Sequence, residues 1–141
     1  MALEASATPT RVLVVDDEPV TANIYAITLE RAGYAIKLAA SSEEALGLLG
    51  QERFELVLLD LYFPGTGGWV LLSKIREQFL AQELPVVVLS AESNEGVRTG
   101  LLALGANDFV VKPVHPPALL ELVKLRAATR KGDGGNEVER P

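Results

Sequence analysis

Apolar residues gather in four short runs along the chain, and each run predicts a β-strand. The runs are too short for helices and are rich in branched side chains, which favour strands. Because they contain no alternating polar positions, both faces of each strand should be buried, as in a parallel sheet covered by helices. A weaker run at 35–38 includes Lys37 and indicates an edge strand. The stronger runs are Val12–Val15, Leu56–Leu59, Val86–Leu89 and Phe109–Val111.

Helical spacing fills the first interval between these strands. Pro19 is typical of a first helical turn, and Gly33 is typical of a residue that ends a helix. Between them, the apolar residues Val20, Ile24 and Ile27 recur at helical spacing. The pattern therefore predicts a helix that begins at Pro19 and ends before Gly33.

Four further helices follow from similar signals. Ser41 and Glu44 have the spacing of a capping box and open a short helix that runs to about residue 49. Apolar positions within 71–79 and 97–104 mark the third and fourth helices, and Gly105 ends the fourth. The fifth helix begins at Pro116 or Pro117 and runs to about residue 128.

The alternation of five strands with five helices indicates the α/β class. Such an order predicts an open, five-stranded parallel sheet with helices on both faces. We expect one domain over residues 11–128, preceded by a flexible N-terminus at 1–10. Residues 129–141 are rich in glycine and charge, which is typical of a flexible tail or the start of a linker.

Composition narrows the function classes. The chain has no cysteine, which excludes disulfides, thiolate metal sites and cysteine nucleophiles. Its formal net charge is −6 and it has no basic stripe, so we expect no direct contact with nucleic acid. No apolar run has the length of a signal peptide or of a bilayer span, so we expect a cytoplasmic protein without a membrane contact.

Polar residues follow four of the five predicted strands. Asp16 and Asp17 come after the first, Asp60 after the third, Ser90 after the fourth and Lys112 after the fifth. The carboxyl ends of parallel strands meet at one edge of the sheet, where open α/β folds bind ligands. The sequence therefore predicts one site built from these five side chains.

The residue types at this edge are suited to phosphoryl transfer. The three carboxylates repel one another unless a cation is present, and oxygen ligands without cysteine favour Mg²⁺. The Lys112 ammonium and the Ser90 hydroxyl match the charge of a transferring phosphoryl group, and a carboxylate can be the nucleophile. A simpler interpretation of one residue remains open, because Asp17 has a position from which it can cap the following helix.

Taken in order, these residues resemble the response regulator receiver family, and the match covers residues 11–128. The resemblance is to its chemotaxis-regulator-like members, and it implies the flavodoxin-like strand order 2-1-3-4-5. Each mark alone is short, but their order and intervals are specific. The marks are Asp16-Asp17, Asp60-Leu-Tyr-Phe-Pro64 with Gly68, Ser90-Ala91, and Gly105-Ala-Asn-Asp-Phe109 leading to Lys112-Pro113.

The resemblance implies a role for each site residue. Asp60 would be the phosphoacceptor, and Mg²⁺ would be held by Asp16, Asp17, Asp60 and the backbone carbonyl of Tyr62. Lys112 would bind the phosphoryl oxygens together with Ser90 and Ala91.

The resemblance also implies a switch. The peptide bond between Lys112 and Pro113 would be cis. Ser90 and Phe109 would move on phosphorylation and change the surface of the fourth helix, fifth strand and fifth helix. Tyr62 and Glu92 occupy variable positions that tune the lifetime of the phosphoryl group in such domains.

Implied partners are a sensor histidine kinase or a histidine phosphotransfer protein as donor, and a downstream protein target or output domain. The chain would not be an enzyme beyond its own phosphorylation and dephosphorylation. A homodimer through the switching surface is a further hypothesis, because the fifth helix is apolar on more than one face. Three residues depart from the common family pattern without removing a catalytic group: Phe63, Gly67 and Val114.

Other functions fit the sequence less well. The turn at 16–19 lacks the glycines of a dinucleotide site, and no Gly-Lys-Ser/Thr sequence of a nucleotide hydrolase is present. An aspartate-nucleophile phosphatase typically has an Asp-x-Asp sequence, but here the residue two positions after Asp60 is Tyr62. A pseudo-receiver that binds partners without phosphorylation typically loses an acidic or lysine position, and all are kept here. Whether the chain is a single-domain regulator or part of a larger regulator or hybrid kinase stays open.

Overall fold

Strands and helices alternate along the chain in the computed structural model, which describes residues 8–62 and 67–131. The strands are β1 (Arg11–Val15), β2 (Ala35–Ala39), β3 (Leu56–Asp60), β4 (Val86–Ser90) and β5 (Asp108–Val111). The helices are α2 (Pro19–Arg31), α3 (Ser42–Gln51), α4 (Gly67–Gln78), α5 (Glu95–Leu104) and α6 (Pro116–Lys131).

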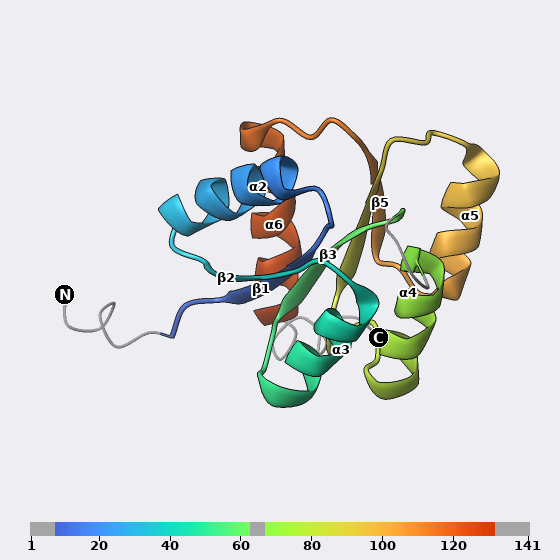
Figure 1. The fold of residues 1–141 in the computed structure, drawn as a ribbon, viewed down its shortest axis with the longest axis horizontal. Helices are drawn as coiled ribbons and strands as arrows, with labels where there is room; N and C mark the ends of the chain where they lie inside the picture. Colours follow the sequence, from blue (N-terminus) through green and yellow to red (C-terminus); the bar gives the residue numbers. More distant parts are fainter. Residues whose placement is uncertain (1–7, 63–66, 132–141) are drawn as a thin grey trace.

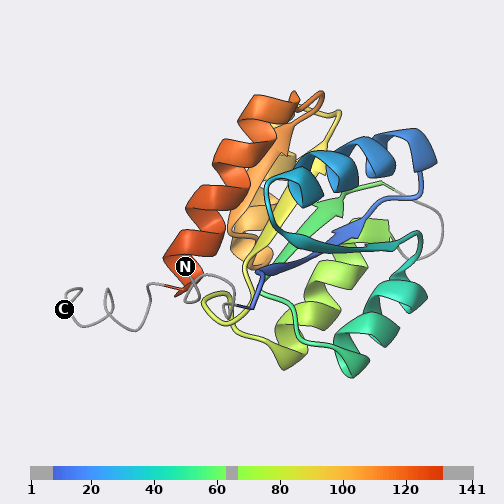
Figure 2. The same cartoon turned by 90° about the vertical axis from the view of Figure 1, so that its left-hand side faces the viewer.

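The five strands form one parallel sheet in the order β2-β1-β3-β4-β5. This confirms the predicted order, with the weak run at 35–38 forming the edge strand β2. Helices α2 and α6 cover one face, and α3, α4 and α5 cover the other (Figures 1 and 2). All five carboxyl ends therefore point to the same edge of the sheet, where the predicted site should lie.

The central strands β3 and β4 are buried along their whole length. Alternate residues of β3 enter different layers, because Val57 and Leu59 pack with α3, α4 and α5 whereas Leu56 and Leu58 pack with α2 and α6. A strand buried on both faces has no position for a solvated polar side chain. This explains why the apolar runs are uninterrupted until Asp60 and Ser90 end them.

Helix α2 has the predicted bounds but buries a different face from the one that its aliphatic spacing suggests. Val20, Ile24 and Ile27 are 65%, 48% and 50% exposed. The helix is held instead by small alanines, an aromatic ring and one leucine: Ala22, Ala26, Tyr25 and Leu29. Three β-branched side chains thus remain on the surface of α2 in the described part of the chain.

The helix ends agree largely with their sequence signals. The Ser41 hydroxyl accepts a hydrogen bond from the Glu44 backbone N–H at the start of α3, and Gly105 ends α5 with φ +119°. Helix α6 continues to Lys131, beyond the expected end near 128. Of the segments predicted to be flexible, 1–10 and 129–141, residues 1–7 and 132–141 lie outside the described residues, whereas residues 129–131 belong to α6.

The edge of the sheet opposite the predicted site is fixed by the guanidinium of Arg76. It donates hydrogen bonds to the carbonyls of Gly105 (2.8 Å), Leu84 (3.0 Å) and Phe79 (3.3 Å), and to Oδ1 of Asn107 (2.9 Å). These contacts join α4 to the ends of α5 and the starts of β4 and β5. No local sequence pattern predicts this network, because its partners come from separate elements of the chain.

In the described ranges, no helix is both long and apolar enough to cross a membrane.

Candidate functional site

The sheet brings the predicted site residues to its carboxyl edge. Asp60 and Ser90 are the last residues of β3 and β4, and Asp16 and Lys112 directly follow β1 and β5. The register pairs Val15 with Leu59, so the ends of β1 and β3 lie side by side. Pairing between β3 and β4 places Ser90 beside the same edge.

Three carboxylates form an acidic cluster at this edge. Asp16, Asp17 and Asp60 each offer an oxygen, and these atoms all lie within 4.8 Å of one another. Asp16 and Asp60 are buried, with 4% and 9% exposure, whereas Asp17 is exposed. Such a set of oxygen ligands with one open side fits a hard divalent cation. Tyr62 follows Asp60 by two residues, and the role of its carbonyl as a metal ligand stays a prediction.

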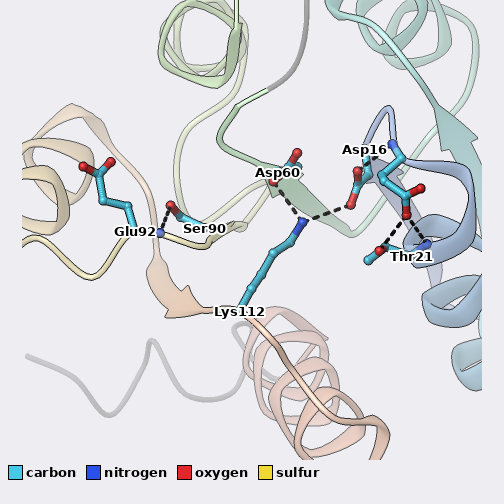
Figure 3. A network of polar contacts seen from close by, with 7 residues as sticks. Asp16, Thr21, Asp60, Ser90, Glu92 and Lys112 are labelled. Atoms are coloured by element: carbon cyan, nitrogen blue, oxygen red, sulfur yellow. Dashed lines mark hydrogen bonds and ion pairs between the residues drawn. The ribbon is translucent and has the colours of Figure 1, made fainter.

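The Asp16 carboxylate is oriented by the backbone. Its Oδ1 accepts a hydrogen bond from the Glu18 N–H at 2.9 Å, which fixes the turn between β1 and α2. Glu18, not Asp17, caps the helix, because its Oε1 accepts hydrogen bonds from the backbone N–H and the hydroxyl of Thr21 (Figure 3). These hydrogen bonds lower the pKa of Glu18. The cap leaves the Asp17 carboxylate available to the acidic cluster.

Lys112 places a positive charge between two of the carboxylates (Figure 3). Its Nζ lies 3.1 Å from Oδ1 of Asp60 and 3.4 Å from Oδ2 of Asp16. The lysine side chain is 20% exposed, so the ammonium is shielded from bulk water on most sides. The peptide bond between Lys112 and Pro113 is cis.

Burial and charge shift the pKa values of this ion pair. Burial, together with the charges of Asp16 and Asp17, raises the pKa of Asp60 by more than the hydrogen bond and charge of Lys112 lower it. Burial lowers the pKa of Lys112, but the hydrogen bond and charge of Asp60, with the charge of Asp16, outweigh burial and raise it. Both pKa values are raised because Asp60 is the more deeply buried partner and also faces the carboxylates of Asp16 and Asp17. The site therefore stabilises added positive charge.

Ser90 lies beside Asp60 but is bonded to the following loop. The serine is 1% exposed, and its Oγ accepts a hydrogen bond from the Glu92 N–H at 2.9 Å (Figure 3). The Glu92 side chain in turn accepts a hydrogen bond from the Tyr62 hydroxyl. This contact joins the loops after β3 and β4. The hydrogen bond was not predictable from the sequence, because it depends on how two separate loops fold.

The remaining predicted residues lie near the site in different environments. Ala91 is exposed and borders Lys112 in a surface hollow. Phe109 is 8% exposed and packs in the core layer with α3, α4 and α5. Of the three departures, Phe63 lies outside the described residues, Gly67 begins α4 with φ +78°, and Val114 is half-buried. A movement of Phe109 stays a prediction.

Comparisons with known proteins agree with this geometry. A sequence model described as the response regulator receiver domain matches residues 12–124. An uncharacterised 14.6 kDa protein of Leptolyngbya boryana is 36% identical over 113 residues, which are 80% of this chain and 86% of that protein. The phosphate regulon transcriptional regulatory protein PhoB of Pseudomonas aeruginosa is 32% identical over 127 residues, or 89% of this chain and 55% of the regulator. The chain thus spans about half the length of that relative.

A solved structure shares the same architecture. The CheY-like response regulator receiver domain protein of Methanospirillum hungatei JF-1 superposes with a TM-score of 0.83 and 27% sequence identity. The match covers 89% of this chain and 99% of that one. Nearly the whole of the described fold is therefore shared with that protein.

Proposed function

The chain belongs to the response regulator receiver domain family, and we propose that it accepts a phosphoryl group on the carboxylate of Asp60 with the help of Mg²⁺. The observation that carries the proposal is the arrangement of Asp16, Asp17 and Asp60 around one position, with the ammonium of Lys112 beside them. A carboxylate is a competent nucleophile for phosphoryl groups, and the cluster provides positive charge and metal ligands next to it.

The carboxylate of Asp60 is the attacking group. One of its oxygens forms a bond to phosphorus as the bond to the leaving group breaks, and the product is an aspartyl phosphate. Bound Mg²⁺ would supply positive charge to the carboxylates and the phosphoryl oxygens. Because such transfers depend mainly on positioning and electrostatics, the fixed places of Asp16 and Lys112 carry much of the rate enhancement.

Lys112 and Ser90 hold the transferred group. The ammonium exchanges part of its contact with Asp60 for the phosphoryl oxygens, which carry more negative charge. The Ser90 hydroxyl can donate a hydrogen bond to the same oxygens, whether or not its oxygen still accepts the hydrogen bond from the Glu92 N–H. Movement of Ser90 would couple the new charge to Phe109, which packs one strand away on β5. The surface of α5, β5 and α6 is then the output face.

The donor and the target of this switch are proteins of the two-component system. We infer that a sensor histidine kinase or a histidine phosphotransfer protein supplies the phosphoryl group, and that a protein target or output domain reads the α5–β5–α6 face. A homodimer through that face is a further form of the output. We place the protein in the cytoplasm, where such donors and targets meet.

Two alternatives differ in what happens at Asp60. A pseudo-receiver would bind partners without phosphorylation, but the three acidic residues are present within 4.8 Å of one another and Lys112 contacts Asp60. A phosphatase would need a second carboxylate at position 62, where Tyr62 instead donates its hydroxyl hydrogen bond to Glu92. We therefore infer no catalytic turnover beyond the chain's own phosphorylation and dephosphorylation.

Beryllofluoride, which imitates an aspartyl phosphate, tests the proposal without a donor protein. A Cβ on Gly100 of α5 would lie 3.1 Å from the Trp69 ring of α4, so indole fluorescence reports on the packing of these helices. Addition of beryllofluoride should change this fluorescence only with Mg²⁺, and not at all in Asp60→Asn. Asp108→Asn, at the far end of β5, should respond like the natural chain. A response in Asp60→Asn would exclude Asp60 as the acceptor.

A further inference from the structure

A hollow of about 460 Å³ lies beside the candidate phosphorylation site, between α2 and the loop from β5 to α6. Ile24, Tyr25, Val114 and Pro116 give it a mainly apolar lining. Its volume falls within the range of small-molecule binding sites, which combine an apolar wall with a few placed polar groups. The hollow therefore has the size and surface of a site for a small ligand.

Lys112 belongs both to the hollow and to the site. The lysine lines the hollow, and its ammonium reaches Oδ1 of Asp60 at 3.1 Å. Ala91, the residue after Ser90, lies at the same boundary. A molecule with an anionic group at Lys112 would thus have its other end in the hollow.

The chemistry of the lining limits what this other end can be. Ile24 is 48% exposed and Tyr25 is 4% exposed, so the wall offers apolar surface to a ligand and is backed by a buried ring. Lys112 is the one lysine or arginine among the lining residues, and its charge is directed to the acidic cluster. The other polar side chains of the lining are Thr21 and His115, and the rest of the lining is mainly apolar. The hollow favours an uncharged apolar body over a second anionic group.

We propose that the hollow binds the acyl group of an acyl phosphate donor, so that donors with longer apolar acyl groups phosphorylate Asp60 faster than those with shorter ones. The inference rests on the proposed function of Asp60. In the reaction, the Asp60 oxygen bonds to phosphorus as the bond between phosphorus and the acyl oxygen breaks. The carboxylate product leaves with that electron pair, so no proton or further reactant is needed.

A series of donors tests the preference. Acetyl, propionyl and butyryl phosphate are each incubated with the natural chain and Mg²⁺, and the initial rate of the single phosphate adduct is measured by intact mass at low donor concentration. Each added methylene should raise the rate about two- to fourfold, the expected effect of removing it wholly or partly from water. Equal rates along the series would overturn the inference and leave the proposed function standing.

Matched variants locate the preference in the hollow. Ile24→Ser removes apolar wall, and Val20→Ser makes the same kind of change one turn away on α2, outside the lining. The ratio of butyryl to acetyl rates should fall toward one in Ile24→Ser and stay unchanged in Val20→Ser. An unchanged ratio in Ile24→Ser would overturn the inference.

Phosphoramidate, which has no acyl chain, distinguishes a failure of the inference about the hollow from a failure of the proposed function. An adduct from phosphoramidate together with a flat acyl series contradicts only the role of the hollow. No adduct from any of the four donors would overturn the proposed function and this inference with it.

Discussion

The Nζ atom of Lys112 lies 3.1 Å from Oδ1 of Asp60 at the carboxyl edge of the sheet. The two residues come from strands β3 and β5, which are separated by β4. The lysine therefore spans the end of β4 to reach the carboxylate, and Ser90 lies at the end of that intervening strand. This relationship places a carboxylate, an ammonium group and a hydroxyl close to one another at the same edge.

Removal of the ammonium should slow phosphorylation far more than it affects folding. Lys112→Met keeps most of the side-chain stem and removes the positive charge. We expect the initial rate with phosphoramidate and Mg²⁺ to fall by about 100-fold or more, because one preorganised charge at a transition state commonly contributes this much. Lys124→Met, an exposed change on α6, should leave the rate unchanged. Equal rates for the two variants would contradict the role of Lys112.

Asp60→Asn should stabilise the metal-free protein at neutral pH. The raised pKa of Asp60 means that ionisation destabilises the folded state. This destabilisation begins as pH rises past the ordinary carboxyl pKa and is complete above the raised folded pKa. The variant should therefore melt at a higher temperature than the natural chain at pH 7 in EDTA, and the difference should shrink as pH falls through that interval.

With magnesium, the natural chain should melt at a higher temperature than Asp60→Asn. We expect the ion to bind the folded acidic cluster, so it should raise the melting temperature of the natural chain more than that of Asp60→Asn. Thermal unfolding with and without Mg²⁺ measures both effects. A pH-independent loss of stability in the variant under EDTA would show that Asp60 contributes packing rather than electrostatic strain.

Gly68 is required by the close approach of α4 to the loop after β3. A Cβ at this position would lie 2.6 Å from the carbonyl oxygen of Leu61 and 3.0 Å from that of Asp60. Gly68→Ala should therefore destabilise the fold by about 1–3 kcal/mol, as overpacking does. Gly47→Ala, in the middle of α3 with open space around it, should stabilise by about 0.5–1 kcal/mol. Chemical denaturation of both variants gives the comparison, and similar changes would contradict the contact.

The strand ends and the site were predictable because one physical rule governs both. A strand buried on both faces stays apolar until it reaches the functional edge, so Asp60 and Ser90 stand out as the first polar residues after their runs. The order of the strands along the sheet does not follow from this rule and came from the family resemblance. The acidic pair Asp16-Asp17 and Lys112 follow from the strand-end rule, because they are the first polar residues after the first and fifth apolar runs.

Contacts that depend on surface packing were not predictable. The β-branched residues Val20 and Ile24 mark a helix correctly but lie on its solvent side, because alanines, Tyr25 and Leu29 occupy the buried face of α2. Arg76 and Asn107 look like ordinary surface residues in the sequence. Their hydrogen bond at 2.9 Å joins elements that only the tertiary fold brings together.

The guanidinium of Arg76 should be important for stability. Arg76→Met keeps the apolar stem and leaves the carbonyls of Gly105 and Leu84 without this donor. We expect a loss of about 2–4 kcal/mol in the free energy of unfolding, because several half-buried acceptors become unsatisfied. Arg98→Met removes only an exposed contact to Glu95 and should change stability by less than about 0.5 kcal/mol. Urea titration of the two variants checks this, and equal losses would show that the network contributes little.

Intact mass after incubation with acetyl phosphate tests the central claim most directly. The natural chain with Mg²⁺ should gain the mass of one phosphate, and the gain should be absent in Asp60→Asn and in EDTA. Asp108→Asn, a matched change at the far end of β5, should gain it normally. An adduct of equal yield in Asp60→Asn, or one that forms equally well in EDTA, would contradict a magnesium-assisted transfer to Asp60.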